Sequence, residues 1–187
     1  MSFGNIVLLV IVAVVGYLIV IYNKFVSLRA GMDASWSDID VQLKRRYDLI
    51  PALVDTVRGY KDYEADTLEK VIQARQQGLS AGTMDEKAAA ANVLSGALGK
   101  LFALAEAYPD LKANTNFLNL QDELSNIENA IQNARRYYNA IVRDYNAKVE
   151  SFPDLFVAQK FNFTARDYFE LDESEAQAAK KMPKIDL

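Results

Sequence analysis

Apolar side chains recur in alternating steps of three and four along residues 117–145. They are Phe117, Leu120, Leu124, Ile127, Ile131, Ala134, Tyr138, Ile141 and Tyr145. This spacing is typical of the buried seam of a long bundle helix of the coiled-coil type. Neither proline nor glycine occurs between residues 113 and 152, so the pattern predicts one helix of about 55 Å.

A second apolar face begins earlier in the chain. It comprises Phe25, Leu28, Met32, Trp36, Ile39, Leu43, Ile50, Leu53, Val54, Val57 and Tyr60. Proline lacks an N–H and clashes with the preceding helical turn, so we expect Pro51 to kink or break this helix near residues 49–50. Apolar positions resume at Leu68, and the pattern predicts a helix end around residues 78–82.

The next helix has a recognisable start and stop. Thr83 can cap its first turn, with Glu86 three residues later completing a capping box. The Tyr108-Pro109 pair is expected to end it. No segment alternates apolar and polar residues for long enough to predict a strand. The expected fold is all-α: an N-terminal single transmembrane helix followed by an antiparallel bundle of three to four long helices, four if the first divides at Pro51.

The N-terminal segment has the length and composition of a membrane anchor. Residues 3–22 carry no charge and would span about 30 Å as a helix, which matches the hydrocarbon core of a bilayer. A cleaved signal peptide would need basic residues in positions 1–5 and a small-x-small site after Tyr22, and both are missing. Representative anchor residues are Ile6, Val10, Val14, Leu18 and Ile21.

Charge around this segment predicts its orientation. Basic residues follow it and none precedes it; they are Lys24, Arg29, Lys44, Arg45 and Arg46. The positive-inside rule then leaves the N-terminus outside and the bulk of the chain in the cytoplasm, with an inverted, periplasmic bundle as the alternative. The expected domains are an anchor at 1–22, a helical bundle at 23–170 and a polar C-terminal tail at 171–187.

Composition excludes several classes of chemistry. The chain has no cysteine and no histidine, so disulfides, thiolate nucleophiles, imidazole bases and Glu-x-x-His metal motifs are excluded. A net charge of -4 argues against general nucleic-acid binding. The segment from Gly96 to Lys100 lacks the spacing of a phosphate-binding loop. We therefore expect no enzyme and assign no catalytic, cofactor-binding or metal-binding residue, although a carboxylate-only magnesium or calcium site stays open.

Arg46 falls on the apolar seam between Leu43 and Ile50, where an unpaired charge is costly. One interpretation is a buried ion pair with Glu106 or Glu128, and the other is a basic patch against anionic lipid. We favour the ion pair, because a straight helix would place Arg46 about 36 Å beyond Tyr22.

Two further patterns concern aromatic residues. Tyr138-Asn139 and Tyr145-Asn146 lie one heptad apart, which predicts that both tyrosines face the core and that both asparagines make polar bonds between helices. The segments 106–111 and 150–155 share the order Glu, any residue, aromatic, Pro, Asp, Leu. We interpret each as an aromatic residue that closes the core, followed by a proline that starts a new turn.

Several motifs occur in the order typical of one family. They are Tyr22-Asn23, residues 36–46, residues 48–54, Ala74-Arg75, residues 106–111, residues 116–129, residues 134–139, Tyr145-Asn146 and Phe152-Pro153. From about residue 5 to residue 170 the chain resembles the LemA family of bacterial membrane-anchored proteins. The resemblance implies a cytoplasm-facing helical bundle on one N-terminal helix, and it brings no catalytic residue to this sequence.

The expected function is an interaction or scaffolding role at the bacterial inner (cytoplasmic) membrane. The expected partners are the lipid bilayer, further copies of the chain and an unidentified membrane or cytoplasmic protein, without a cofactor. Candidate determinants of folding and assembly are Arg45, Arg46, Glu106, Glu123, Glu128, Tyr138, Asn139, Tyr145 and Asn146. The alternative is a bundle that binds a small molecule or metal, or an enzyme that uses neither histidine nor cysteine.

Overall fold

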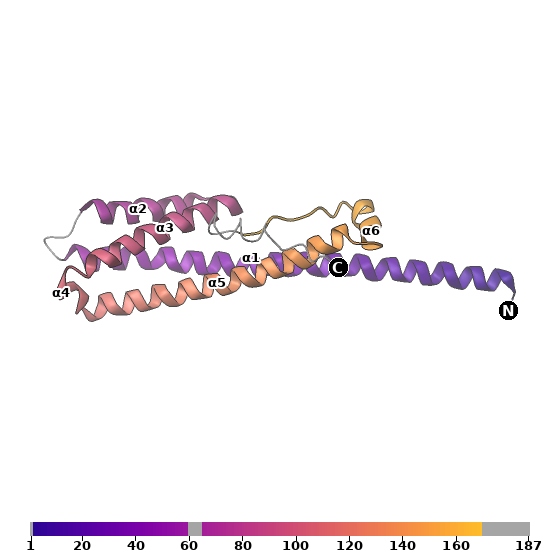
Figure 1. Cartoon of the computed structure of the whole chain (residues 1–187), viewed down its shortest axis with the longest axis horizontal. Helices are drawn as coiled ribbons and strands as arrows, with labels where there is room; N and C mark the ends of the chain where they lie inside the picture. Colours follow the sequence, from indigo (N-terminus) through magenta and orange to yellow (C-terminus); the bar gives the residue numbers. More distant parts are fainter. Residues whose placement is uncertain (1, 60–64, 170–187) are drawn as a thin grey trace, which may run out of the picture. The chain divides into compact units, whose positions relative to one another are not determined.

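The computed structural model describes residues 2–59 and 65–169, and its described elements are all helices (Figure 1). They are α1 (Phe3–Arg58), α2 (Ala65–Ser80), α3 (Met84–Ala105), α4 (Pro109–Lys112), α5 (Thr115–Glu150) and α6 (Asp154–Lys160). The all-α fold class with an apolar N-terminal helix is therefore confirmed. The predicted polar tail at 171–187 and the predicted core position Tyr60 lie outside the described residues.

The chain forms two compact units. Unit 1 contains α1 up to Asp38 together with Ala134–Tyr168, and unit 2 contains Ile39–Asn133 with Phe169. The two longest helices, α1 and α5, each supply one part of their length to each unit. Both predicted apolar faces are therefore divided between two cores.

The core of unit 2 is built from the predicted periodic positions. Buried side chains come from α1, α2, α3 and α5; they include Ile39, Leu43, Ile50, Leu53, Leu68, Val71, Leu94, Leu101, Phe117, Leu124, Ile127 and Ile131. The short connection between α2 and α3 makes these helices a hairpin. Alanines fill much of the buried face of α3, and their small side chains allow a close approach of neighbouring backbones.

The expected break at Pro51 does not occur. Helix α1 runs without interruption to Arg58, with Pro51 inside it. Proline at this position leaves the carbonyl of Tyr47, four residues earlier, without its helical donor. Nε of Arg75 in α2 donates a hydrogen bond of 2.8 Å to that oxygen. Because a side chain replaces the missing N–H, the helix continues, and the first long helix ends beyond Pro51.

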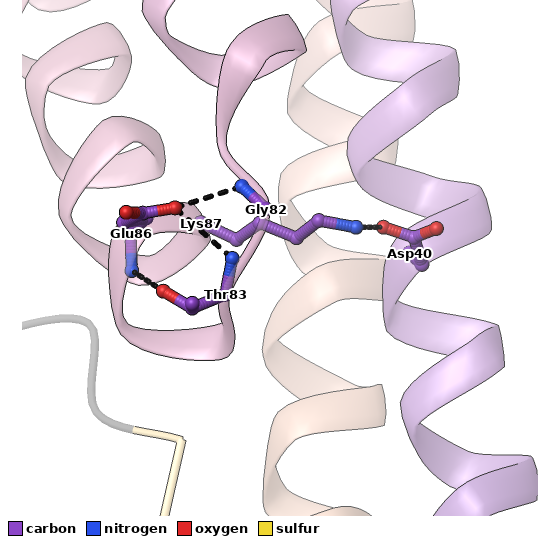
Figure 2. Close-up of polar contacts among 5 residues, drawn as sticks. All are labelled: Asp40, Gly82, Thr83, Glu86 and Lys87. Atoms are coloured by element: carbon purple, nitrogen blue, oxygen red, sulfur yellow. Dashed lines mark hydrogen bonds and ion pairs between the residues drawn. The ribbon is translucent and has the colours of Figure 1, made fainter.

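The predicted capping box is confirmed at the start of α3 (Figure 2). The hydroxyl of Thr83 accepts a hydrogen bond from the backbone N–H of Glu86, and Oε2 of Glu86 accepts bonds from the N–H groups of Gly82 and Thr83. These backbone bonds lower the pKa of Glu86. From the same turn, Lys87 reaches Asp40 on α1, so the cap is tied to the neighbouring helix.

Unit 1 is held together by aromatic contacts along the two long helices. The ring of Phe25 lies 5.8 Å from that of Tyr145 and stacks on Phe163 at 4.8 Å. The rings of Trp36 and Tyr138 lie 6.1 Å apart, edge to face. Of the predicted heptad seam, Tyr138 and Tyr145 are buried in this unit, whereas Ala134 and Ile141 are half-buried and the neighbouring Val142 is buried instead.

The interpretation of the two aromatic-proline segments is only partly right. Pro109 starts the single turn of α4, and Leu111 is buried. In the second segment Pro153 precedes α6, but Phe152 is 79% exposed. The expectation that both aromatic residues close the core is therefore wrong at Phe152. This residue follows the end of α5, and its side chain points to the outside of unit 1.

Candidate functional site

An ion pair between a buried arginine and a half-buried glutamate lies within unit 2. Nη2 of Arg46 lies 2.9 Å from Oε2 of Glu128 on α5 and donates a 2.9 Å hydrogen bond to the hydroxyl of Ser95 on α3. The predicted pair is therefore present, with Glu128 as the partner, while Glu106 is exposed at the end of α3. Burial lowers the pKa of Arg46, and the charge of Glu128 opposes this shift.

Tyr47 packs beside this ion pair. Its ring lies so close to α2 that a Cβ on Gly78 would sit 2.5 Å from the phenol oxygen. Burial raises the pKa of Tyr47, whereas the neighbouring charge of Arg46 lowers it. Among the described residues, neither the Tyr47 hydroxyl nor Nε of Arg46 has a hydrogen-bond partner. The cluster is packed by helices on several sides, which suits a structural centre better than a catalytic one.

A second polar contact lies in unit 1 and fixes the segment after α6. The amide of Asn146 donates a 2.8 Å bond to the carbonyl of Arg166 and accepts a 2.9 Å bond from its N–H. The Tyr138 hydroxyl lies 3.4 Å from the carbonyl of Asp167. Asn146 does make polar bonds, but the prediction of a bond between helices is wrong, because its partner is the backbone of Arg166 in the segment after α6. Burial raises the pKa of Tyr138 and of Tyr145.

The remaining candidate residues occupy less buried positions. Arg45 is exposed and donates a 3.3 Å bond to Gln42 one turn earlier, Glu123 is exposed on α5, and Asn139 is half-buried. No structural observation gives Arg45 or Glu123 a partner on another helix within the described ranges. Their proposed part in assembly therefore stays a prediction.

The anchor residues separate into two groups. Every side chain in residues 3–20 is exposed, including Ile6, Val10, Val14 and Leu18, whereas Ile21 is 4% exposed. The bare part of α1 is thus 18 residues, or about 27 Å, long. Among the described helices, α1 and α3 are long and apolar enough to cross a membrane, but α3 buries one face in unit 2. Helix α1 is the better membrane segment.

A groove of mixed polar and apolar lining runs between α2 and α3. It encloses about 340 Å³, and its lining includes Thr67, Lys70, Gln73, Asn92, Gly96 and Lys100. The described residues contain no group of three or more Asp or Glu side chains that could hold a metal ion. Hydrogen-bonding groups and two ammonium groups would suit a small anion better than a cation.

A sequence model of the LemA family matches residues 35–186. The chain belongs to the LemA family. The LemA protein of Metamycoplasma hominis is 34% identical over 137 residues, which make up 71% of this chain and 61% of that protein. The magnetosome protein MamQ 2 of Paramagnetospirillum magneticum is 24% identical over 186 residues, 86% of this chain and 68% of that protein. The chain thus spans less than two thirds of the M. hominis relative.

The bare apolar part of α1 and this family membership identify a membrane-associated helical protein. The LemA-like motifs recognised in the sequence meet in space. Arg46 belongs to the motif at 36–46, and Glu128 to the motif at 116–129. Pro51 and Arg75 come from two further motifs: Pro51 leaves the carbonyl of Tyr47 without its helical donor, and Arg75 donates a hydrogen bond to that carbonyl. Much of what makes this LemA-family sequence recognisable therefore lies in contacts between its helices.

Sequence reasoning missed three features of this LemA-family chain. The contact between Lys87 and Asp40 and the packing of Tyr47 on Gly78 join residues with no local signal of partnership. The third is a set of exposed aromatic side chains around α6, namely Phe152, Phe156 and Phe161. Three phenylalanines within ten residues are visible in the sequence, and this density could have indicated an aromatic surface.

Proposed function

We propose that this chain is a single-pass protein of the bacterial inner membrane, which presents a cytoplasmic helical bundle for self-association and partner binding. The observation that carries the proposal is the continuity of α1. One helix of 56 residues begins with 18 exposed, uncharged and mostly apolar residues and ends in the core of unit 2. A bundle held in this way has a raised effective concentration toward other proteins of the same membrane.

The charge distribution supports the cytoplasmic orientation. Lys24 and Arg29 follow the bare part of α1 and are exposed, whereas residues 1–5 contain no basic side chain. Basic residues close to a membrane segment favour the cytoplasmic side. The inverted orientation, with the bundle in the periplasm, is the alternative that a labelling experiment must distinguish.

The composition of the described sites supports binding rather than catalysis. The most buried charged group, Arg46, is already engaged by Glu128 and Ser95 inside the bundle. Exposed apolar side chains such as Leu118 and Tyr137 on α5 leave surface for contacts between proteins. We therefore assign the chain a non-enzymatic role.

The test uses the absence of native cysteine. Tyr137→Cys in the full-length chain should be labelled by a membrane-impermeant maleimide only after the inner membrane is opened. A photo-crosslinking residue at Leu118 should give a homo-oligomer or one recurrent protein adduct. Labelling in intact spheroplasts would overturn the orientation. A chain that stays monomeric and without adducts in cells would overturn the scaffold role.

A second candidate function rests on the groove between α2 and α3. Lys70 and Lys100 lie in the lining of this groove, and their ammonium groups could attract a small anionic molecule. Native mass spectrometry of the full-length protein released from membranes would detect such a ligand as a discrete added mass. Loss of this mass in a Lys70→Glu, Lys100→Glu variant would support the ligand-binding function over the scaffold role.

A further inference from the structure

The aromatic side chains around α6 are far more exposed than is usual for such residues. Phe152 is 79% exposed, Phe156 60% and Phe161 55%. The rings of Phe152 and Phe156 lie 5.8 Å apart and contact each other edge to face. Exposed apolar side chains of this kind, two of them in contact, mark a surface that a membrane or another protein covers. We call Phe152, Phe156 and Phe161 the aromatic patch.

The position of the patch along α1 indicates what covers it. The ring of Phe161 lies 4.8 Å from that of Tyr22, within the same unit. Tyr22 is two residues, or about 3 Å along the helix, beyond Val20, the last residue of the bare segment. A bilayer has an interfacial layer of about 5–7 Å on each side of its hydrocarbon core. If residues 3–20 span that core, Phe161 lies within the interfacial layer.

Local geometry turns these rings outward while their neighbours turn inward. Asn162 has a φ of 56°, a left-handed conformation that asparagine tolerates better than most residues. Around this turn Phe161 is exposed, whereas Phe163 is 7% exposed and stacks on Phe25. The inward ring holds the segment against α1, and the outward ring is left for the surroundings.

The charges near the patch fit the surface of an anionic membrane. Lys24 and Lys160 are exposed, and the guanidinium of Arg29 lies 5.7 Å from the centre of the Phe163 ring. Asp154 is 13% exposed and pairs with Lys148, so the carboxylate of α6 is compensated. Glu150 is the exposed carboxylate at the end of α5. Protein surfaces that contact the interfacial layer of an anionic membrane typically combine basic residues with apolar and aromatic side chains.

We propose that the aromatic patch is a second membrane contact, inserted into the interfacial layer of the leaflet in which α1 leaves the bilayer. The proposal rests on the proposed membrane span of residues 3–20. Aromatic side chains are favoured at this depth. With α1 as the first attachment and the patch as the second, the tilt of unit 1 relative to the membrane normal is restricted.

The test uses tryptophan fluorescence, because the chain has a single tryptophan. In a Trp36→Phe background, three variants each carry one new tryptophan: Phe156→Trp in the patch, Val12→Trp in the anchor and Tyr137→Trp as the control. Tyr137 is 63% exposed in the same unit, about 20 Å along α5 from its end at Glu150. Each full-length variant is reconstituted into phosphatidylcholine–phosphatidylglycerol vesicles with brominated acyl chains.

We expect Phe156→Trp to lose about half of its emission to bromines near the carbonyl end of the chains. Val12→Trp should be quenched most by bromines near the methyl end, and Tyr137→Trp by neither. If Val12→Trp is quenched and Phe156→Trp is not, the proposed membrane contact of the aromatic patch is wrong, whereas the proposed membrane span of residues 3–20 stands. An unquenched Val12→Trp would overturn the anchor itself.

Two further results would overturn the patch. A blue-shifted but unquenched Phe156→Trp would mean that protein, such as a second copy of the chain, covers it. Equal quenching of Tyr137→Trp would mean that unit 1 lies on the bilayer without a specific contact.

Discussion

At the scale of residues, Arg46 and Glu128 form one ion pair in unequal surroundings. The Arg46 side chain is 5% exposed, whereas that of Glu128 is 30% exposed. A carboxylate that loses its partner here can turn to water, but the guanidinium is enclosed by α1, α3 and α5. The two single substitutions should therefore differ in their cost.

Glu128→Ala should lower the free energy of unfolding by about 3 kcal/mol, because it leaves a buried, unpaired cation. Arg46→Met should cost about 1 kcal/mol, because the freed carboxylate reaches solvent. Denaturant unfolding of the full-length protein in detergent measures both. Glu123→Ala, at an exposed carboxylate on the same helix, is the control and should change stability by less than about 0.5 kcal/mol. Equal costs for Glu128→Ala and Glu123→Ala would contradict the role of the pair.

Gly78 is a residue whose helix propensity and packing oppose each other. Alanine normally stabilises an exposed helical position relative to glycine by up to about 1 kcal/mol. At Gly78 the added methyl group would overlap the Tyr47 ring, so Gly78→Ala should destabilise the chain by about 1–3 kcal/mol. Gly99→Ala, where no atom lies within 4 Å of the new Cβ, should be neutral or stabilising. Thermal unfolding of the two variants measures both effects, and a melting temperature of Gly78→Ala that is unchanged or raised would refute the overlap.

At the scale of elements, α1 passes through Pro51 because another helix completes its hydrogen bonding. The carbonyl of Tyr47 receives Nε of Arg75, which is 28 residues away in sequence. Local rules correctly identify the missing donor but cannot supply its replacement. The continuity of α1 is therefore a property of the α1–α2 pair.

A double-mutant cycle tests this dependence. Arg75→Met should cost about 1–2 kcal/mol in the native background, because the Tyr47 carbonyl loses its partner. In a Pro51→Ala background the new backbone N–H can donate to that oxygen, and Arg75→Met should cost clearly less. Chemical unfolding of the four proteins gives the coupling energy, which we expect to be at least about 0.5 kcal/mol. Purely additive effects would show that Arg75 acts independently of Pro51.

At the scale of the whole molecule, α1 and α5 each serve two cores, and α1 also provides the proposed membrane span. Placement in the membrane then depends on few charges. The N-terminal flank is neutral, and Lys24 is the first charged side chain after the bare segment.

Adding positive charge in front of the anchor should change the orientation. Ser2→Lys with Asn5→Lys introduces two cations on the flank that we propose to lie outside, where the positive-inside rule disfavours positive charge. We expect a mixed or inverted population, seen as maleimide labelling of a Tyr137→Cys reporter in intact spheroplasts. Ser2→Gln with Asn5→Gln is the uncharged control and should keep the reporter protected. Unchanged protection in the lysine variant would mean that flank charge does not set the orientation.

Sequence alone determined the features that depend on neighbouring residues. The heptad seam of α5, the apolar anchor and the Thr83–Glu86 capping box follow from side chains within a few turns of one another, so period and composition suffice to predict them. The family resemblance could also be recognised from ordered motifs, and the family match confirms it.

Only the tertiary structure decided the partners that lie far apart along the chain. It selected Glu128 rather than Glu106 for Arg46, paired Asn146 with a backbone segment twenty residues away, and placed Arg75 on the carbonyl that Pro51 leaves open. It also left Phe152 outside the core that its pattern predicted for it. Periodicity predicts which face of a helix is buried. The partner of each residue on that face depends on how far neighbouring helices are shifted along, and rotated about, their axes. All the packed side chains together set this shift and rotation.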